Sequence, residues 1–136
     1  MNHIQSPRTD DNAIEQEIQA KGLTAPRVTP ADIEGAISSE HYFTAGDGVA
    51  GAFTNTKIAQ GIGVFPDEIG PLKPELGLLT FCVLVLKNGF TVTGESACAS
   101  PENFDAELGR KIARENAKNK IWSLMGYALK DRLSGN

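Results

Sequence analysis

The chain contains little that marks a secreted, membrane or metal-binding protein. It has 136 residues, of which only two are cysteine and two are histidine. Its longest apolar run, near Leu78–Leu86, is shorter than the roughly 18 residues that a membrane-spanning helix needs. The N-terminal stretch MNHIQSPRTDDN lacks the apolar centre of a signal peptide. We therefore expect a cytoplasmic protein with no membrane partner.

The scarcity of cysteine and histidine argues against a disulfide framework and against a zinc site. A two-residue turn at Asn88–Gly89 predicts that Cys82 faces Glu95 and that Cys98 faces Leu79. The thiols are then not cross-strand neighbours, so no disulfide is expected. Two cysteines and two histidines do not make a convincing zinc set. We expect neither a metal nor a cofactor.

The acidic charge is unevenly spread. The net charge is −4, but residues 1–100 hold six basic and twelve acidic residues, whereas residues 101–136 hold seven and five. This balance argues against nucleic-acid binding, because such binding relies on many basic contacts to phosphates. A small anionic ligand needs only a local basic cluster, and such a ligand stays possible.

The length favours one domain. Residues 1–28 are expected to be an N-terminal arm, partly disordered or holding a short helix that Asp10 or Asp11 begins and Gly22 ends. Residues 29–136 are expected to be a single α+β domain.

The first half of this domain gives mixed signals. Thr29 to Asp32 has the pattern of a capping box, which predicts a short helix ending near Ser39. His41–Thr44 is expected to be a strand, with another possible around Val49–Phe53. Residues 54–77 are rich in glycine and proline and are expected to be a long loop.

Leu78–Lys87 and Phe90–Cys98 predict a β-hairpin. The Asn88–Gly89 dipeptide between them favours a type I′ turn. The first strand is apolar on both faces, so it should be central in the sheet. The second has one apolar face and one face of threonine and glutamate, so Glu95 is expected to be solvated.

A long helix should follow, capped by Ser100 and running from about Asn103 to Met125. Its apolar residues fall on two opposite sides: Phe104, Leu108, Ile112 and Trp122 on one, and Ala113, Ala117, Ile121, Leu124 and Ala128 on the other. A monomer surface helix usually shows one stripe. One side should cover the sheet, and the other should meet a second subunit or another segment; the alternative is a helix sandwiched within one subunit. The expected fold is therefore α+β, an antiparallel sheet with a central hairpin packed against a long C-terminal helix, oligomerising through helices.

The same helix carries the main candidate for chemistry. Arg110, Arg114 and Lys118 recur every four residues and form one row. The row can be an ordinary solvated face with intrahelical ion pairs, or it can bind phosphate, for which arginine is well suited. Phe90, Phe104, Trp122 and Tyr127 are candidates for stacking on a base. No Gly-x-Ser-x-Gly elbow or phosphate-binding P-loop is present, so no enzyme activity is expected.

Two stretches resemble a known family. They are VTPADIEGAISSEHYFTAGDGV and LLTFCVLVLKNGFTVTGESACASPENFDAELGRKIARENAKNKIW, and the blocks NGFTVTGESAC, NFD and GRKIARENA are the specific part. They resemble a family of small proteins of tailed phages and prophages, which is itself similar to the phage sponges that act against Thoeris immunity.

The resemblance implies a function in the cytoplasm of the host bacterium. The sponges are homo-oligomers that sequester cyclic ADP-ribose isomers or cyclic oligonucleotides without cleaving them. Carried over to this chain, the resemblance implies ligand-binding roles for Phe90, Asn103, Phe104, Arg110, Arg114 and Asn116. The alternatives are a small phage accessory protein that binds a host protein and a structural oligomer with no ligand.

Overall fold

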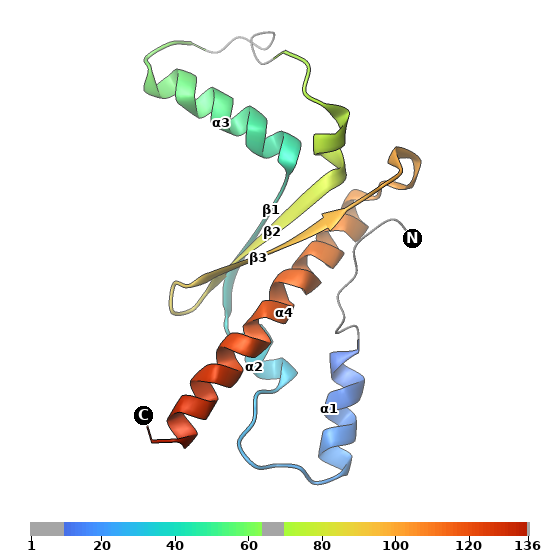
Figure 1. Ribbon diagram of the computed structural model, residues 1–136, viewed down its shortest axis with the longest axis vertical. Coiled ribbons are helices and arrows are strands. Elements are labelled where there is room, and N and C mark those ends of the chain that lie inside the picture. Colours follow the sequence, from blue (N-terminus) through green and yellow to red (C-terminus); the bar gives the residue numbers. More distant parts are fainter. Residues whose placement is uncertain (1–9, 64–69, 136) are drawn as a thin grey trace.

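Short-range signals set most of the element boundaries. The computed structural model describes residues 10–63 and 70–135 (Figure 1). In chain order, the helices and strands are α1 (Asp11–Ala20), α2 (Pro30–Gly35), β1 (Ile37–Thr44), α3 (Ala45–Ala59), the 3₁₀ helix η1 (Pro74–Leu78), β2 (Leu79–Leu86), β3 (Thr91–Ala97), the 3₁₀ helix η2 (Pro101–Asn103) and α4 (Ala106–Leu133). The start of the expected arm, residues 1–9, and residues 64–69 of the expected loop lie outside the described residues.

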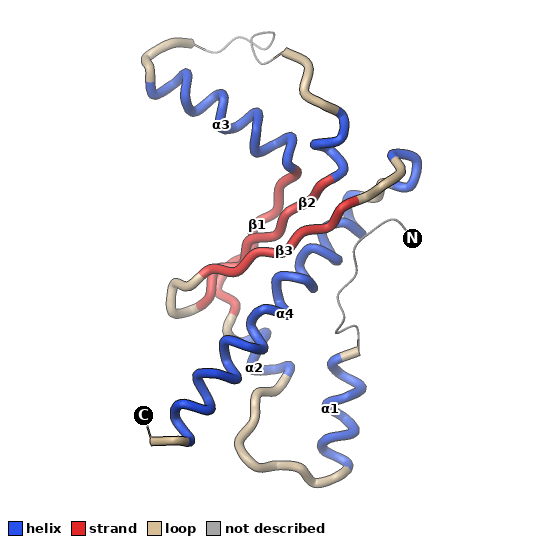
Figure 2. Tube along the Cα trace, in the orientation of Figure 1, coloured by secondary structure: helices blue, strands red, loops and turns tan. Residues whose placement is uncertain are grey.

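The three strands form one antiparallel sheet in the order β1-β2-β3, and α4 runs across one face of it (Figure 2). The expected α+β class, the hairpin and the central position of β2 are therefore confirmed. We call the face that α4 covers the inner face. The opposite side is the outer face, made by Ser39, His41, Phe43, Leu79, Phe81, Val83, Val85, Thr91, Thr93, Glu95 and Ala97.

The hairpin register is shifted by one residue from the prediction. Cys82 pairs with Gly94, not with Glu95. The Leu86 N–H donates to the Phe90 carbonyl at 2.8 Å, so the loop has three residues. Among the described residues, only glycines have positive φ, and Gly89 lies at +88°. A type I′ turn would also require positive φ at Asn88, so the predicted two-residue type I′ turn is wrong.

Burial explains why this register is adopted. It places Val92 beside Leu84 on the inner face, where their exposed fractions are 6% and 0%. A slip of one residue in a strand moves its side chains to the opposite face. Both faces of β2 are apolar, so only the docking of α4 decides which of them β3 must match.

The core lies between the inner face and α4. Its buried members are Ile33, Cys82, Leu84, Leu86, Val92, Ala113, Ala117 and Ile121. The contact is closest at Gly94, where an added Cβ would overlap the Ala113 carbonyl oxygen and the Ala117 nitrogen. Ala113 and Ala117, two small residues on one of the predicted apolar sides of the helix, allow this close approach of α4 to β3.

The predicted bounds of the last helix were wrong at both ends. Asp105, not Ser100, is the N-cap of α4, and its carboxylate accepts from the Leu108 N–H at 3.0 Å. Pro101–Asn103 forms a separate 3₁₀ turn, so Phe104 precedes the helix. The helix continues past Met125 to Leu133.

The two apolar sides of α4 have different partners in the same chain. Ala113, Ala117 and Ile121 face the sheet, as the core shows. Trp122 packs against the core on another side and lines two cavities, of about 250 and 80 Å³, together with residues of α1 and α2. For these residues, the alternative of a helix sandwiched within one subunit is correct.

No strand forms around Val49–Phe53. Residues 54–59, which were expected to begin a long loop, are helical. Residues 45–59 form α3, which begins with a complete capping box: the Thr44 side chain accepts from the Asp47 N–H, and the Asp47 carboxylate accepts from the Thr44 N–H. The capping box of Thr29 and Asp32 on α2 is confirmed, although α2 ends at Gly35 rather than near Ser39.

We predict that Gly94→Ala lowers the free energy of unfolding by about 2–3 kcal/mol, because the new methyl group must push α4 away from β3. Chemical denaturation followed by circular dichroism measures the change.

Gly126→Ala is the matched control within α4, because nothing lies within 4 Å of an added Cβ there. Alanine should raise stability by up to about 1 kcal/mol, given the helix propensities. Equal stability of the two variants would contradict the close-packing assignment.

Candidate functional site

Arg114 is the most heavily bonded residue of the basic row. Its Nη1 and Nη2 donate to the two carboxylate oxygens of Glu34 at 3.1 and 2.8 Å, and its Nε donates to Glu40 at 3.0 Å. Glu34 lies on α2 and Glu40 on β1. The guanidinium therefore clamps two elements from the first half of the domain onto α4.

The clamp also shifts the titration of its members. Hydrogen bonds from Arg114 hold the pKa of Glu34 and of Glu40 below the usual range of a glutamate. The bond to Glu34 raises the pKa of Arg114 in turn. A role of Arg114 in phosphate binding stays a prediction, and it would require a ligand to displace these carboxylates.

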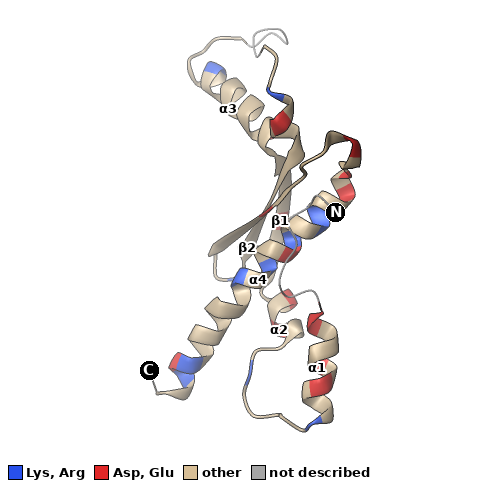
Figure 3. Ribbon diagram, turned by 45° about the vertical axis from the view of Figure 1, so that its right-hand side comes forward, with Lys and Arg blue, Asp and Glu red and all other residues tan. Residues whose placement is uncertain are grey.

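Two further cations, Lys118 of the row and the neighbouring Lys111, also have partners. Lys118 lies 3.4 Å from Glu34 and 3.2 Å from Glu115, and Lys111 pairs with Glu107 at 3.4 Å. The solvated-face interpretation therefore describes Lys111, whose side chain is largely exposed. None of the ion pairs within residues 10–63 and 70–135 involves Arg110, which is exposed on the same helix. Figure 3 shows that basic residues lie along much of α4.

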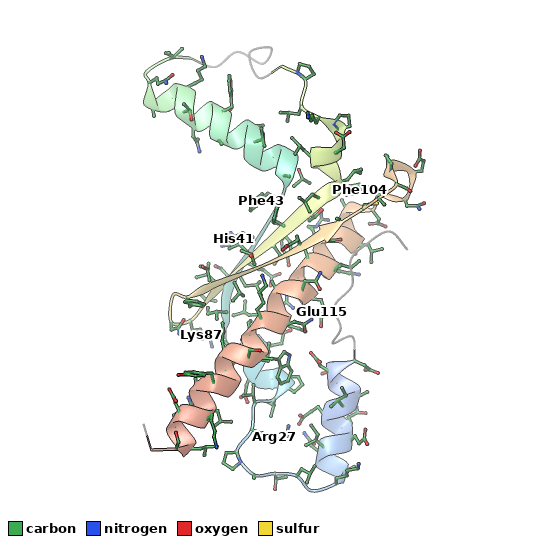
Figure 4. The ribbon with its side chains drawn as sticks, in the orientation of Figure 1. Arg27, His41, Phe43, Lys87, Phe104 and Glu115 are labelled. Atoms are coloured by element: carbon green, nitrogen blue, oxygen red, sulfur yellow. The ribbon has the colours of Figure 1, made fainter. Side chains whose placement is uncertain are left out.

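Arg110 lines a cleft at the end of the sheet where α3 and α4 begin. The cleft has a volume of about 110 Å³ and is lined by Tyr42, Phe43, Thr44, Asp47, Thr80, Phe104, Ala106 and Arg110. The fold thus brings together Arg110 and Phe104, two of the six residues expected to bind ligand. Phe43 and Phe104 both lie at this end of the sheet, and Lys87 lies at the other (Figure 4).

Two helix N-termini and Arg110 border the cleft, and Asp47 adds a carboxylate to its lining. Thr44 caps α3 and Asp105 caps α4, so the N-terminal turns of both helices are adjacent to it. A helix N-terminus carries a partial positive charge, and here the Asp47 N–H already donates to the Thr44 hydroxyl and the Leu108 N–H to the Asp105 carboxylate. With the Arg110 guanidinium and the Phe104 ring, the cleft combines groups that suit a phosphate with one that suits a base.

Tyr42 connects the cleft to the Arg114 clamp. Its hydroxyl donates to the Glu40 carboxylate at 2.9 Å. Burial and this hydrogen bond raise the pKa of Tyr42 well above its usual value, so it stays a neutral donor. Burial also raises the pKa of the Cys82 thiol to about 11, which keeps the thiol protonated at neutral pH.

The remaining predicted ligand residues lie elsewhere. The Asn116 amide donates to the Glu95 carbonyl at 2.8 Å and so joins α4 to β3. Asn103 is exposed in η2. Phe90, 56% exposed, lines an apolar groove of about 430 Å³ at the hairpin end, together with Ala36, Leu86, Lys87, Asn88, Leu124, Met125 and Ala128. Within one chain, the six residues do not form a single pocket.

Sequence reasoning did not find Tyr42 or Thr44 as lining residues, nor Glu34 and Glu40 as partners of Arg114. The capping-box pattern of Thr44 and Asp47 was a usable signal, because it places the start of α3. The partners of Arg114 had no such signal, since they lie 80 and 74 residues away in the chain.

The fold and the cleft define a small α+β protein in which one long helix covers a three-stranded sheet and a cleft lined by Arg110 opens where two helices begin. The chain belongs to the phage protein (N4 Gp49/phage Sf6 gene 66) family, whose model matches residues 28–133. No curated protein and no solved structure matches it significantly. In the described part of the chain, no helix is long and apolar enough to cross a membrane.

The two arginines should differ in their effect on folding. We predict that Arg114→Ala lowers the free energy of unfolding by about 1 kcal/mol, a modest value because Glu34 and Glu40 are almost half exposed. Arg110→Ala should change it by less than about 0.5 kcal/mol. Thermal and urea denaturation test this; equal losses would contradict the assignment of Arg114 as the clamp.

The clamp also predicts a loss of stability in acid. The pKa values of Glu34 and Glu40 are lower in the folded protein than in the unfolded chain, so protons bind more readily to the unfolded state. The contribution should be complete above about pH 4.5 and lost as the pH falls through the folded values. A double variant, Glu34→Gln with Glu40→Gln, should show a smaller decrease in melting temperature between about pH 5 and 3. An unchanged pH profile would contradict the prediction.

Proposed function

We propose that the protein is a phage anti-defence sponge that sequesters a cyclic nucleotide immune signal, either a cyclic ADP-ribose isomer or a cyclic oligonucleotide, without cleaving it. It would act as a homo-oligomer in the cytoplasm of the host bacterium. The observation that carries the proposal is the convergence of Arg110 and Phe104 in the cleft at the N-termini of α3 and α4. The resemblance of two stretches of the sequence to phage proteins similar to the sponges that act against Thoeris immunity supports the same assignment.

The chemistry required is binding alone. Arg110 would form charge-assisted hydrogen bonds to a phosphate, and Phe104 would stack on the base. Tight binding lowers the concentration of free signal by mass action, so no nucleophile or general base is needed. The raised pKa of the Cys82 thiol is consistent with this role, because a protonated thiol is a poor nucleophile.

The cleft volume limits what one chain can hold. At about 110 Å³, it is smaller than the roughly 300–1,000 Å³ of typical ligand sites. One phosphate with part of a base would fit this volume better than a whole cyclic dinucleotide. The remaining contacts would come from a second copy of the chain, which is the role that the homo-oligomer has in this proposal.

Calorimetric titration against cyclic ADP-ribose isomers and cyclic di- and trinucleotides tests the proposal. We expect saturable binding of at least one compound, and Arg110→Ala should weaken it at least about tenfold through loss of the charge-assisted bonds. Phe104→Ala should also weaken it. Lys111→Ala is the matched control, because Lys111 is the neighbouring exposed cation and pairs with Glu107.

Chemical analysis of the ligand separates a sponge from a hydrolase. After denaturation of the complex, the compound should be recovered unchanged. Absence of heat and of any melting-temperature shift across the whole panel would contradict the proposal, as would recovery of cleaved product.

A second candidate is a small accessory protein that binds a host protein. The apolar groove at the hairpin end favours it, since exposed Phe90 and Leu124 offer apolar surface beside Met125. If the nucleotide panel fails, weaker capture of a host protein by Phe90→Ser than by the natural chain would favour this candidate.

A further inference from the structure

Thr80 gives the cleft beside Arg110 a buried hydroxyl group. It lies on β2 between Thr44 of β1 and Ser96 of β3, and only 4% of it is exposed. Within residues 10–63 and 70–135, its hydroxyl forms no hydrogen bond. Burying a hydroxyl without a hydrogen bond is unfavourable, and buried polar groups normally have a partner. Because Thr80 lines the cleft, a ligand bound there can be that partner.

The same cleft contains an acid and a base that are not paired. Asp47 and Arg110 both line it, and neither takes part in the ion pairs of the described ranges 10–63 and 70–135. One carboxylate oxygen of Asp47 accepts from the Thr44 N–H at 3.0 Å, and the other is available. A carboxylate can only accept and a guanidinium can only donate. A ligand that suits both must carry an anion and a hydrogen-bond donor.

The volume of the cleft restricts the ligand to a few atoms. About 110 Å³ corresponds to roughly four water molecules of about 30 Å³ each. One phosphate group and one adjoining hydroxyl fit into this space, whereas a whole nucleoside does not. The base would lie outside, and the Phe43 and Phe104 rings at the same end of the sheet are available to it (Figure 4).

We propose that the cleft recognises an internal phosphate, esterified on both sides, together with the ribose 2′-hydroxyl next to it. Arg110 binds the phosphate. A 2′-hydroxyl is both a donor and an acceptor, so it donates to the Asp47 carboxylate and accepts from Thr80. The inference rests on the proposed function for the presence of a nucleotide at Arg110, and it adds which part of the nucleotide enters the cleft.

Asp47 determines the kind of phosphate that the cleft accepts. A terminal phosphate carries a charge of about −1.5 to −2 at neutral pH, whereas an internal phosphate carries a single negative charge. Arg110 balances one charge, and the Asp47 carboxylate repels a second. All phosphates of a cyclic nucleotide are internal. The cleft should therefore favour cyclic nucleotides over linear ones that end in a phosphate.

Thr80 and Asp47 together determine the kind of sugar. A carboxylate is a common partner of a ribose 2′-hydroxyl in nucleotide sites. A site built to bind a hydroxyl strongly rejects the analogue that lacks it, because its own polar groups are then left without partners. A deoxyribose would leave the Thr80 hydroxyl buried and unbonded, as it is in the free protein. We therefore expect the cleft to select ribose.

Calorimetric titration of the full chain with linear dinucleotides tests the inference. ApA carries one internal phosphate with a 2′-hydroxyl beside it, dApdA lacks that hydroxyl, and adenosine 3′-monophosphate has the hydroxyl beside a terminal phosphate. ApA should bind at least about tenfold more tightly than either of the others. Equal affinities for ApA and dApdA would overturn the inference, as would no binding of ApA at millimolar concentration.

Thr80→Val removes the hydroxyl and keeps the shape of the side chain. It should weaken ApA binding at least about tenfold and leave dApdA binding unchanged. It should also raise the melting temperature of the free protein by about 2–4 °C, because a buried hydroxyl without a partner is lost. Thr93→Val, at an exposed position of β3, is the matched control and should leave binding unchanged. A lower melting temperature with unchanged binding would make Thr80 a structural residue.

Asp47→Asn removes the charge and keeps an oxygen that can accept from the Thr44 N–H. The preference for ApA over adenosine 3′-monophosphate should fall at least about threefold, since the repulsion of the second phosphate charge is lost. Asp32→Asn is the matched control, because Asp32 has the same position in the capping box of α2. An unchanged preference in the Asp47→Asn variant would contradict the role of this carboxylate.

The linear compounds separate this inference from the sponge function. Binding of the cyclic panel without discrimination between ApA and dApdA would support the sponge and overturn the inference. Selective binding of ApA, lost in the Thr80→Val variant, would support the inference even if no cyclic nucleotide binds and the sponge function fails.

Discussion

The close approach of α4 to β3 at Gly94 is the constraint on which the rest of the structure depends. A helix that touches the strand backbone at Ala113 and Ala117 must lie flat along the inner face. That position decides which face of β2 is buried. The buried face in turn decides the register of β3, because Val92 must align with Leu84. A single missing side chain therefore determines the hairpin loop as well as the packing of the core.

The same position of α4 gives the arginines of the basic row different surroundings: Arg114 forms ion pairs within the fold, and Arg110 lines the cleft. Arg114 reaches Glu34 and Glu40, which hold α2 and β1 against the helix. Arg110 lies one helical turn before Arg114 and lines the cleft instead. Two arginines with the same local sequence pattern thus acquire different roles, since the carboxylates lie beside only one of them.

The cleft, α3 and the outer face of the sheet are neighbouring features of an architecture that leaves apolar surface open. The inner face has a complete core, with Leu84 and Ile121 fully buried. The outer face has stacked aromatic rings and a projecting helix with no buried residue. Phe43 belongs to both features, because it lies on the outer face and also lines the cleft.

The sequence by itself determined the features whose causes lie within a few residues. The capping box at Thr29, the hairpin around Gly89 and the central place of β2 follow from local propensity and from apolar patterning. It did not determine the helical state of residues 45–59, whose glycines obscured the capping box at Thr44. Only the tertiary structure decided the strand register, the partners of Arg114 and the meeting of Arg110 with Phe104. Those depend on contacts between residues far apart in the chain, and no local pattern encodes them until α4 has docked on the sheet.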